Sequence, residues 1–186
     1  CKITALVAQG SVQEFPVLNK QNPDIHFQRM STSDNTGFYC VFENKKLKNF
    51  SVDKFDFQGK FISSTKIQDE PVFEVVSDKS LFIFSSSYDK PSKKGKLSLV
   101  EVNLATSAKS PEKMIDQIDV IKERDFSFQF SLSPDKTKLL VVSHYFCLSE
   151  ELPEKAVFRL FEINGMKQIW EKELDNKFKE FYMKTG

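Results

Sequence analysis

Histidine and cysteine come nearest to a metal site in this sequence. The chain has two histidines, His26 and His144, and His144 precedes Cys147 by three residues. A structural zinc site takes about four ligands, and the sequence contains neither a Cys-x-x-Cys nor a His-Glu-x-x-His pattern. His26 alternates with Ile25 and Phe27, so it should point away from them and lie partly exposed in an extended chain. We therefore predict no metal ligand, with His144 at the edge of an apolar strand.

Serines and carboxylates are plentiful, but none stands in a catalytic pattern. Ser63-Ser64 and Ser85-Ser86-Ser87 lack the Gly-x-Ser-x-Gly elbow of hydrolases. The acidic pairs Asp69-Glu70 and Glu150-Glu151 fall in turn-like stretches, where solvated charges are expected. The 6 glycines are scattered, which excludes a phosphate-binding loop. The sequence predicts no catalytic residue, no metal and no cofactor, leaves the binding residues unknown, and favours a non-enzymatic protein.

The three cysteines, Cys1, Cys40 and Cys147, are too few for a disulfide framework. One bridge between Cys40 and Cys147 stays open as an alternative. Both residues lie in apolar, strand-like runs, where a free thiol packs as a small hydrophobic group. The sequence favours two unpaired, packed thiols.

The charge balance argues against a nucleic-acid partner. Lys and Arg number 27 against 26 Asp and Glu, which gives a net charge of +1, whereas a nucleic-acid-binding domain carries a strongly basic face. Two lysine clusters, at Lys45, Lys46 and Lys48 and at Lys90, Lys93, Lys94 and Lys96, are expected in hairpin turns that keep strand ends soluble. Asn49-Phe50-Ser51 matches a glycosylation acceptor but falls within a predicted strand.

Alternation of apolar and polar residues predicts that the chain is built mainly of β-strands, which carry the residues considered above. In an extended chain, the stretch Phe126 to Leu132 places every apolar side chain on one side. The turn Ser133 to Thr137 and the apolar run Leu139 to Val142 follow, so the sequence predicts a β-hairpin. The 19 phenylalanines suit half-buried sheet surfaces.

This hairpin pattern occurs three times in the chain, and each hairpin precedes a strand with a common ending. The expected units span residues 24–67, 72–118 and 125–174. The endings are Phe55-Asp56-Phe57-Gln58, Val100-Glu101-Val102-Asn103 and Phe161-Glu162-Ile163-Asn164, each apolar, acidic, apolar and amide. A unit of four short strands that recurs at about 40 to 50 residues is typical of β-propeller blades.

The run Ser133-Pro134-Asp135-Lys136 resembles the Ser-Pro-Asp-Gly turn of WD40-like repeats of the bacterial type, with Lys136 in the glycine position. The resemblance implies an all-β fold, a partial β-propeller of about three four-stranded antiparallel blades that are the N-terminal blades of a longer protein. Lys177 to Tyr182 would begin a further blade. Three blades leave open edges, so we expect a longer chain or self-association.

Two segments also fit short helices. Residues 111–123 follow a Ser-Pro helix start and carry apolar residues at helical spacing, and residues 172–184 do so in a Lys/Glu-rich stretch. We leave strand and helix open for both.

Residues 1–23 form a separate N-terminal segment with three interpretations. The run from Leu6 to Gln9 is similar to the end of a bacterial export signal with a cut after Ala8 or Gln9; an edge strand and a lipid-bearing Cys1 are the alternatives. No stretch approaches the roughly 18 apolar residues of a membrane-spanning helix. We expect an exported protein (periplasmic, cell-surface or extracellular), with a cytoplasmic location as the alternative.

These features together predict a non-catalytic binding or scaffolding propeller with a protein or peptide partner. Ligands of propellers meet loops and strand ends, where this chain offers Lys, Asp and Ser side chains and aromatic ones such as Tyr88 and Tyr145. The resemblance also allows the propeller domain of a peptidase-type hydrolase whose catalytic residues lie outside this chain.

Overall fold

The computed structural model describes residues 2–6, 12–16, 23–77, 79–120, 122–145 and 155–175, and nearly all of its regular structure is β-strand. The first sheet contains β3 (Ile25–Asp34), β4 (Gly37–Asn44), β5 (Asn49–Phe55) and β6 (Phe61–Ile67). The second contains β7 (Glu70–Val76), β8 (Ser80–Asp89), β9 (Lys94–Asn103) and β10 (Lys113–Asp119). The third contains β11 (Phe126–Leu132), β12 (Lys138–Tyr145), β13 (Lys155–Glu162) and β14 (Lys167–Asp175).

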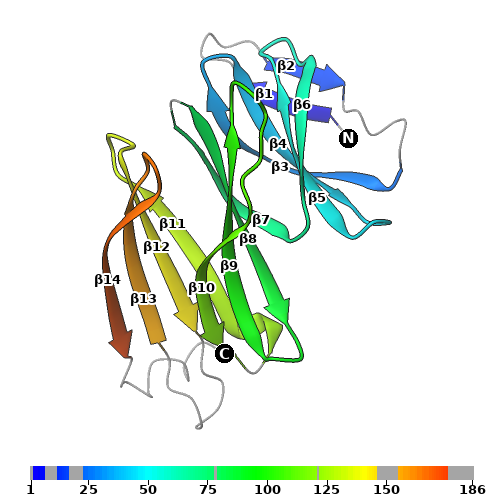
Figure 1. Cartoon of the computed structure of the whole chain (residues 1–186). Helices are drawn as coiled ribbons and strands as arrows, with labels where there is room; N and C mark the ends of the chain where they lie inside the picture. The colour runs from blue at the N-terminus through cyan, green and yellow to red at the C-terminus, as the bar shows by residue number, and fades with distance from the viewer. Residues whose placement is uncertain are drawn as a thin grey trace. The chain divides into compact units, whose positions relative to one another are not determined.

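Within each sheet, every strand pairs antiparallel with the next strand along the chain (Figure 1). The expectation of an all-β chain with three four-stranded antiparallel sheets is therefore confirmed. The three sheets span residues 25–67, 70–119 and 126–175, within two residues of the expected bounds 24–67, 72–118 and 125–174. In the described part of the chain, no helix has the length and apolar character that crossing a membrane requires.

The shared endings lie in the third strand of each sheet or just beyond it. Phe55, Val100 and Phe161 are all buried there. The first ending departs from the pattern, because Phe57 is 51% exposed while Val102 and Ile163 are buried. Asp56 explains this difference: its Oδ1 accepts hydrogen bonds from the backbone N–H groups of Gln58 and Lys60, so the chain turns before Phe57.

The helix alternative for residues 111–123 is wrong. Lys113–Asp119 forms the edge strand β10, and only Glu123–Asp125 makes a short 3-10 turn, η2. Ser110 does not cap a helix, since its N–H donates to the Glu101 carbonyl and its Oγ accepts from the Glu101 N–H. A bulge between Met114 and Asp116 adds one residue to β10, which breaks the alternation and imitates helical spacing in the sequence.

The two ends of the chain are only partly described. Lys2–Leu6 is strand β1 and pairs with β2 (Val12–Pro16), as the edge-strand interpretation expects. The cut predicted at Ala8 or Gln9 and the residues Cys1 and Cys147 lie outside the described residues. In the segment 172–184, residues up to Asp175 continue β14, so the helix interpretation is wrong there; residues 176–184 are not described.

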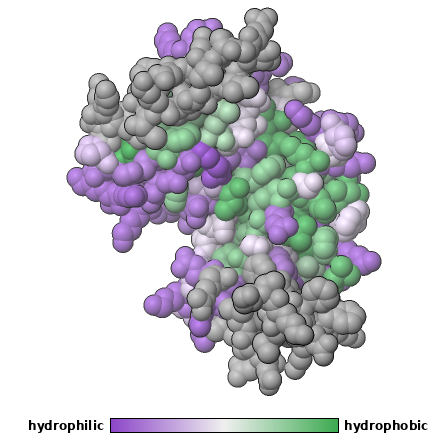
Figure 2. Space-filling model, turned by 180° about the vertical axis from the view of Figure 1, so that it is seen from behind, coloured by the Kyte–Doolittle hydropathy of each residue, from purple (hydrophilic) through white to green (hydrophobic). Residues whose placement is uncertain are grey.

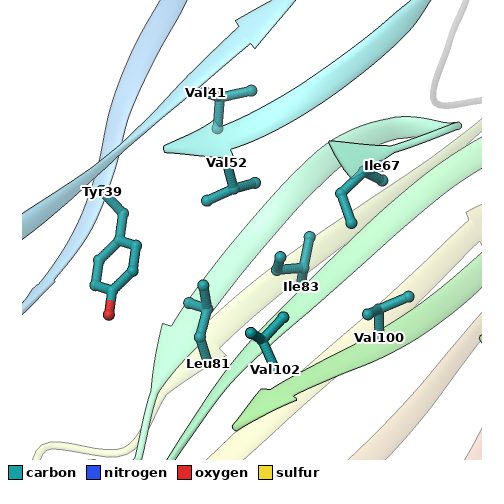
Figure 3. Packing of buried hydrophobic residues seen from close by; sticks show 8 residues of the cluster. All are labelled: Tyr39, Val41, Val52, Ile67, Leu81, Ile83, Val100 and Val102. Carbon is teal, nitrogen blue, oxygen red and sulfur yellow. The ribbon is translucent and has the colours of Figure 1, made fainter. Parts of the chain in front are cut away.

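The chain divides into two compact units, residues 1–85 with 100–111 (unit 1) and residues 86–99 with 112–186 (unit 2). The boundary therefore passes through β8 and β9. The core of unit 1 is a cluster of aliphatic residues and Tyr39 (Figure 3), namely Tyr39, Val41, Val52, Ile67, Leu81, Ile83, Val100 and Val102. The opposite face of β4 supplies a second buried cluster with Phe38, Cys40, Phe42 and Phe55.

Unit 2 buries one face of the third sheet more deeply than the other. Along β12, Leu139 and Val141 are fully buried, whereas Leu140 and Val142 are half-buried. The deeply buried face packs against β9, where Gly95 lies under the ring of Phe126. We call it the inner face of the third sheet and the opposite one its outer face.

Candidate functional site

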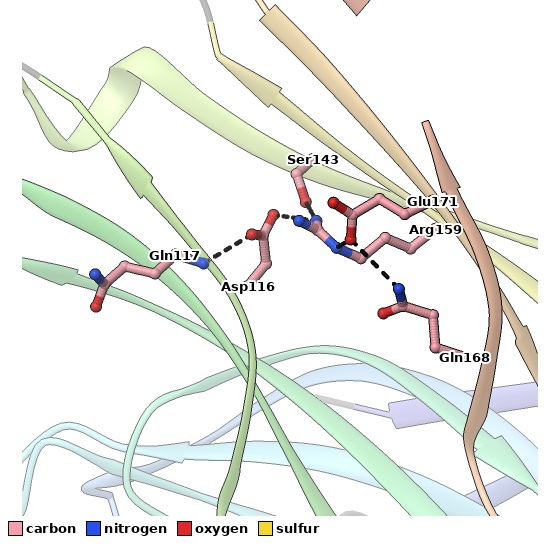
Figure 4. Close-up of polar contacts among 6 residues, drawn as sticks. All are labelled: Asp116, Gln117, Ser143, Arg159, Gln168 and Glu171. Carbon is pink, nitrogen blue, oxygen red and sulfur yellow. Dashed lines mark hydrogen bonds and ion pairs between the residues drawn. The ribbon is translucent and has the colours of Figure 1, made fainter. Parts of the chain in front are cut away.

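Arg159 is the centre of a buried polar cluster in unit 2 (Figure 4). It occupies an inner-face position on β13, between Val157 and Phe161, and its residue surface is only 9% exposed. Its Nε donates a hydrogen bond of 2.8 Å to Oε2 of Glu171 on β14, and its Nη1 donates one of 3.3 Å to Oγ of Ser143 on β12. The strand pairing puts Glu171 directly opposite Arg159, and Ser143 lies in the neighbouring row of the same face, opposite Val157.

Asp116 supplies the second carboxylate from β10, directly after the bulge. Its Oδ2 lies 2.6 Å from Nη1 of Arg159, but no N–H points at this oxygen, so the contact is an ion pair rather than an aligned hydrogen bond. Oδ1 accepts the backbone N–H of Gln117 at 2.8 Å. The cluster thus ties β10 to the third sheet and compensates a guanidinium that would be costly to bury alone.

A second ion pair, in unit 1, joins an arginine to a buried carboxylate, although the Arg29 side chain is 37% exposed. Arg29 on β3 donates to Oε1 of Glu74 on β7 at 2.8 Å and to the Pro71 carbonyl at 2.7 Å. Burial raises the pKa of Glu74, and the charge of Arg29 opposes that rise. Sequence reasoning missed both clusters. The sequence did contain a signal for them. Arg29 and Arg159 lie within apolar strand stretches of a chain whose cations are otherwise mostly lysine, and Arg is the preferred cation for buried ion pairs.

Asp34 accepts four hydrogen bonds at the turn between β3 and β4. The donors are Lys54 Nζ at 2.6 Å, Tyr39 Oη at 2.7 Å, and the N–H and Oγ1 of Thr36, both at 2.7 Å. Burial acts to raise the pKa of Asp34, but these hydrogen bonds outweigh it and hold the pKa far below its usual range. Burial and the neighbouring Asp34 raise the pKa of Tyr39. These groups therefore lock a turn.

The two histidines lie on strands in different units. His26 is half-buried on β3 and pairs in register with Glu43, and His144 is half-buried on β12 between Ser127 and Ala156. Among the residues that the structure describes, no three His, Cys, Asp or Glu side chains are grouped as a metal site would need.

The candidate nucleophiles are held in structural roles. Cys40 is free and fully buried, and burial together with the charge of Asp53 raises the pKa of its thiol to about 12. Ser64 donates to Asp53 Oδ1 at 2.6 Å. Ser85, Ser86 and Ser87 all belong to β8.

The lysine clusters only partly occupy turns. Lys45, Lys46 and Lys48 lie between β4 and β5, and Lys90 and Lys93 between β8 and β9, as expected, while Lys94 and Lys96 belong to β9, so the turn prediction is wrong for these two. Carboxylates face both strand lysines: Lys96 pairs with Asp89 at 2.8 Å and Lys94 with Asp119 at 3.2 Å. These cations are therefore neutralised locally.

The surface that stands out in unit 2 is the outer face of the third sheet. The strand registers place Ser131, Leu140, Leu160 and Trp170 in one row across it, and Gln129, Val142, Phe158 and Lys172 in the next. Trp170 is 43% and Leu174 46% exposed, while Leu140, Val142, Phe158 and Leu160 are half-buried. Figure 2, a view from behind, shows a broad hydrophobic area on the side of unit 2 where this sheet lies.

The two tyrosines expected to bind at strand ends differ in accessibility. Tyr145 is 5% exposed on the inner face, so it cannot meet a ligand there, and Tyr88 is half-buried on β8. Tyr145 is therefore withdrawn from the surface of unit 2, whereas Tyr88 has the same intermediate exposure as Leu140 and Leu160.

Comparison with known proteins adds no family to this description. A scan against protein-family models matched none, and a search of curated proteins found no match.

Proposed function

We propose that this chain is a non-catalytic protein-binding scaffold of β-propeller type, with the outer face of the third sheet as its docking surface. The propeller interpretation draws support from three consecutive four-stranded meanders that share a third-strand ending. The partner is a protein that presents an apolar sheet face of its own.

One observation carries the proposal, namely the row of apolar side chains that ends in Trp170. Contiguous exposed apolar surface with a polar rim marks protein interaction sites, and Trp is the residue most enriched among their energetic anchors. The rim is supplied by Gln129 and Lys172 in the adjacent row. Sheets pack face to face at about 10 Å through such side chains.

The titratable groups of the described residues support a non-catalytic role. Asp34 and Glu74 are engaged in ion pairs, and the Cys40 thiol is buried with a pKa of about 12. A nucleophilic thiol instead needs a lowered pKa and access to solvent.

Photocrosslinking tests the docking surface. A photoreactive amino acid placed at Lys172 on the outer face should give protein adducts in the purified chain or in an extract of the source cells. The same amino acid at Lys66, an exposed lysine of β6 in unit 1, is the matched control. Equal labelling from both positions, or none from position 172, contradicts the proposal.

A further inference from the structure

We infer that the occupant of the outer face is a second copy of this chain, related to the first by a two-fold axis parallel to the strands of the third sheet. The inference rests on the function proposed above and names the partner of that surface. It follows from the distribution of side-chain size across the face.

The outer face is a wedge, with small residues at one edge and large ones at the other. Its β11 edge carries Ser131, and its β14 edge carries Trp170 in the same row. The next row runs from Gln129 to Lys172, and the one after it runs from Ser127 to Leu174. The two middle strands carry mainly apolar side chains, with His144 and Ala156 in the last of these rows, so the difference in size lies between the two edges.

A two-fold axis parallel to the strands turns this wedge into a complementary surface. It places β11 of one copy over β14 of the other and leaves the rows in register. Trp170 of each copy then lies over Ser131 of its mate, and Leu140 lies over Leu160. Large side chains meet small ones at both edges, and apolar side chains meet at the centre, as in aligned sheet packing.

The polar groups of the face fit the same arrangement. Lys172 of one copy lies over Gln129 of the other, so its ammonium group meets an amide oxygen acceptor instead of another lysine. An axis perpendicular to the strands would instead place β14 over β14 and bring the two tryptophan edges together. The wedge therefore selects one axis.

The area of the face suits a weak, specific dimer. A four-stranded sheet about eight residues long presents roughly 500 Å², so two copies would bury about 1,000 Å², the lower limit for specific interfaces. We expect a dissociation constant in the micromolar range.

Trp170 makes this interface directly observable, because it is the single tryptophan of the chain. Sedimentation equilibrium of the whole chain should show a monomer–dimer equilibrium, and Trp170 emission should shift to the blue over the same concentration range. A chain that stays monomeric at all accessible concentrations overturns the inference.

Exchanging the small residue at the β11 edge with the large residue at the β14 edge tests the direction of the two-fold axis. Ser131→Arg adds bulk at an exposed position and should raise the dissociation constant at least tenfold, whereas Ser92→Arg, the same change at an exposed serine of the β8–β9 turn, should not alter it. Ser131→Trp and Trp170→Ser should each weaken the dimer, and the double variant should recover it, because large still meets small. Failure of the double variant to recover, with unchanged circular dichroism, overturns the proposed axis.

The crosslink at position 172 separates the two proposals. Adducts between two copies in the purified chain support the inference. Adducts only to another protein in the extract overturn the second copy and leave the docking surface standing, and the absence of any adduct contradicts both.

Discussion

The ring of Phe126 fills the space that a side chain at position 95 would need. A Cβ on Gly95 would lie 2.8 Å from Cγ and 2.9 Å from both Cδ atoms of that ring, well inside the normal contact distance of carbon atoms. Gly95 on β9 and Phe126 on β11 thus pack these two strands directly together within unit 2.

Gly95→Ala should therefore destabilise unit 2. Overpacking of this kind costs about 1–3 kcal/mol, which urea unfolding followed by Trp170 fluorescence would measure. Phe126→Leu removes part of the ring, so the double variant should lose less than the sum of the two single losses. Strict additivity would mean that the two residues do not compete for this space.

Removal of the Arg159 guanidinium should cost much more than removal of an exposed cation on the same strand. Arg159→Ala leaves Asp116 buried without its counter-charge, and a broken buried pair costs about 3–5 kcal/mol. Lys155→Ala is the control, since the side chains of its pair with Glu173 are 44% and 52% exposed; such a pair contributes about 0–1 kcal/mol. Equal losses in urea unfolding would contradict a structural role for the Arg159 cluster.

Asp34 should make unit 1 sensitive to acid. Its pKa in the folded chain lies below the unfolded value of about 3.9, so its ion pair stabilises the fold fully above that pH and loses this contribution as the pH falls toward the folded pKa. We expect Asp34→Asn to lower the free energy of unfolding by about 2 kcal/mol at neutral pH, and the gap to wild type to narrow steadily below about pH 4. Far-UV circular dichroism in urea measures it; a gap independent of pH would refute the assignment.

Lys136→Gly should stabilise the turn between β11 and β12. Lys136 has a φ of 55°, a left-handed conformation that costs a residue with a Cβ about 1–2 kcal/mol. Glycine avoids this cost, but its greater conformational freedom in the unfolded chain offsets part of the stabilisation. A net gain of about 0.5–1 kcal/mol is expected in thermal or urea unfolding. Lys138→Gly, in the extended strand β12, should lower stability instead.

The strand pattern of this chain could be predicted because alternation and turn residues are local signals. The Ser133–Thr137 turn shows this: Asp135 accepts from Ser133 Oγ, the Thr137 N–H and Thr137 Oγ1, all within five residues. The strand β10 could not be predicted, since a bulge and the pairing of Ser110 with Glu101 on β9 override its helical spacing.

The candidate site was harder to predict because it depends on pairing across strands. Trp170, Leu160 and Leu140 come from three strands and share a face only through the registers of the third sheet. The ion pair of Arg159 with Asp116 likewise joins residues 43 positions apart. An arginine at a buried strand position was the one local sign of it.

The passage of the unit boundary through β8 and β9 has a practical consequence for dissecting the molecule. Unit 2 takes residues 86–99 from the middle of the chain and 112–186 from its end, while unit 1 takes back 100–111. No single truncation separates the two units, because residues 86–99 of unit 2 lie between the two segments of unit 1. Genetic dissection of this protein would have to proceed by circular permutation or grafted loops rather than by shortening.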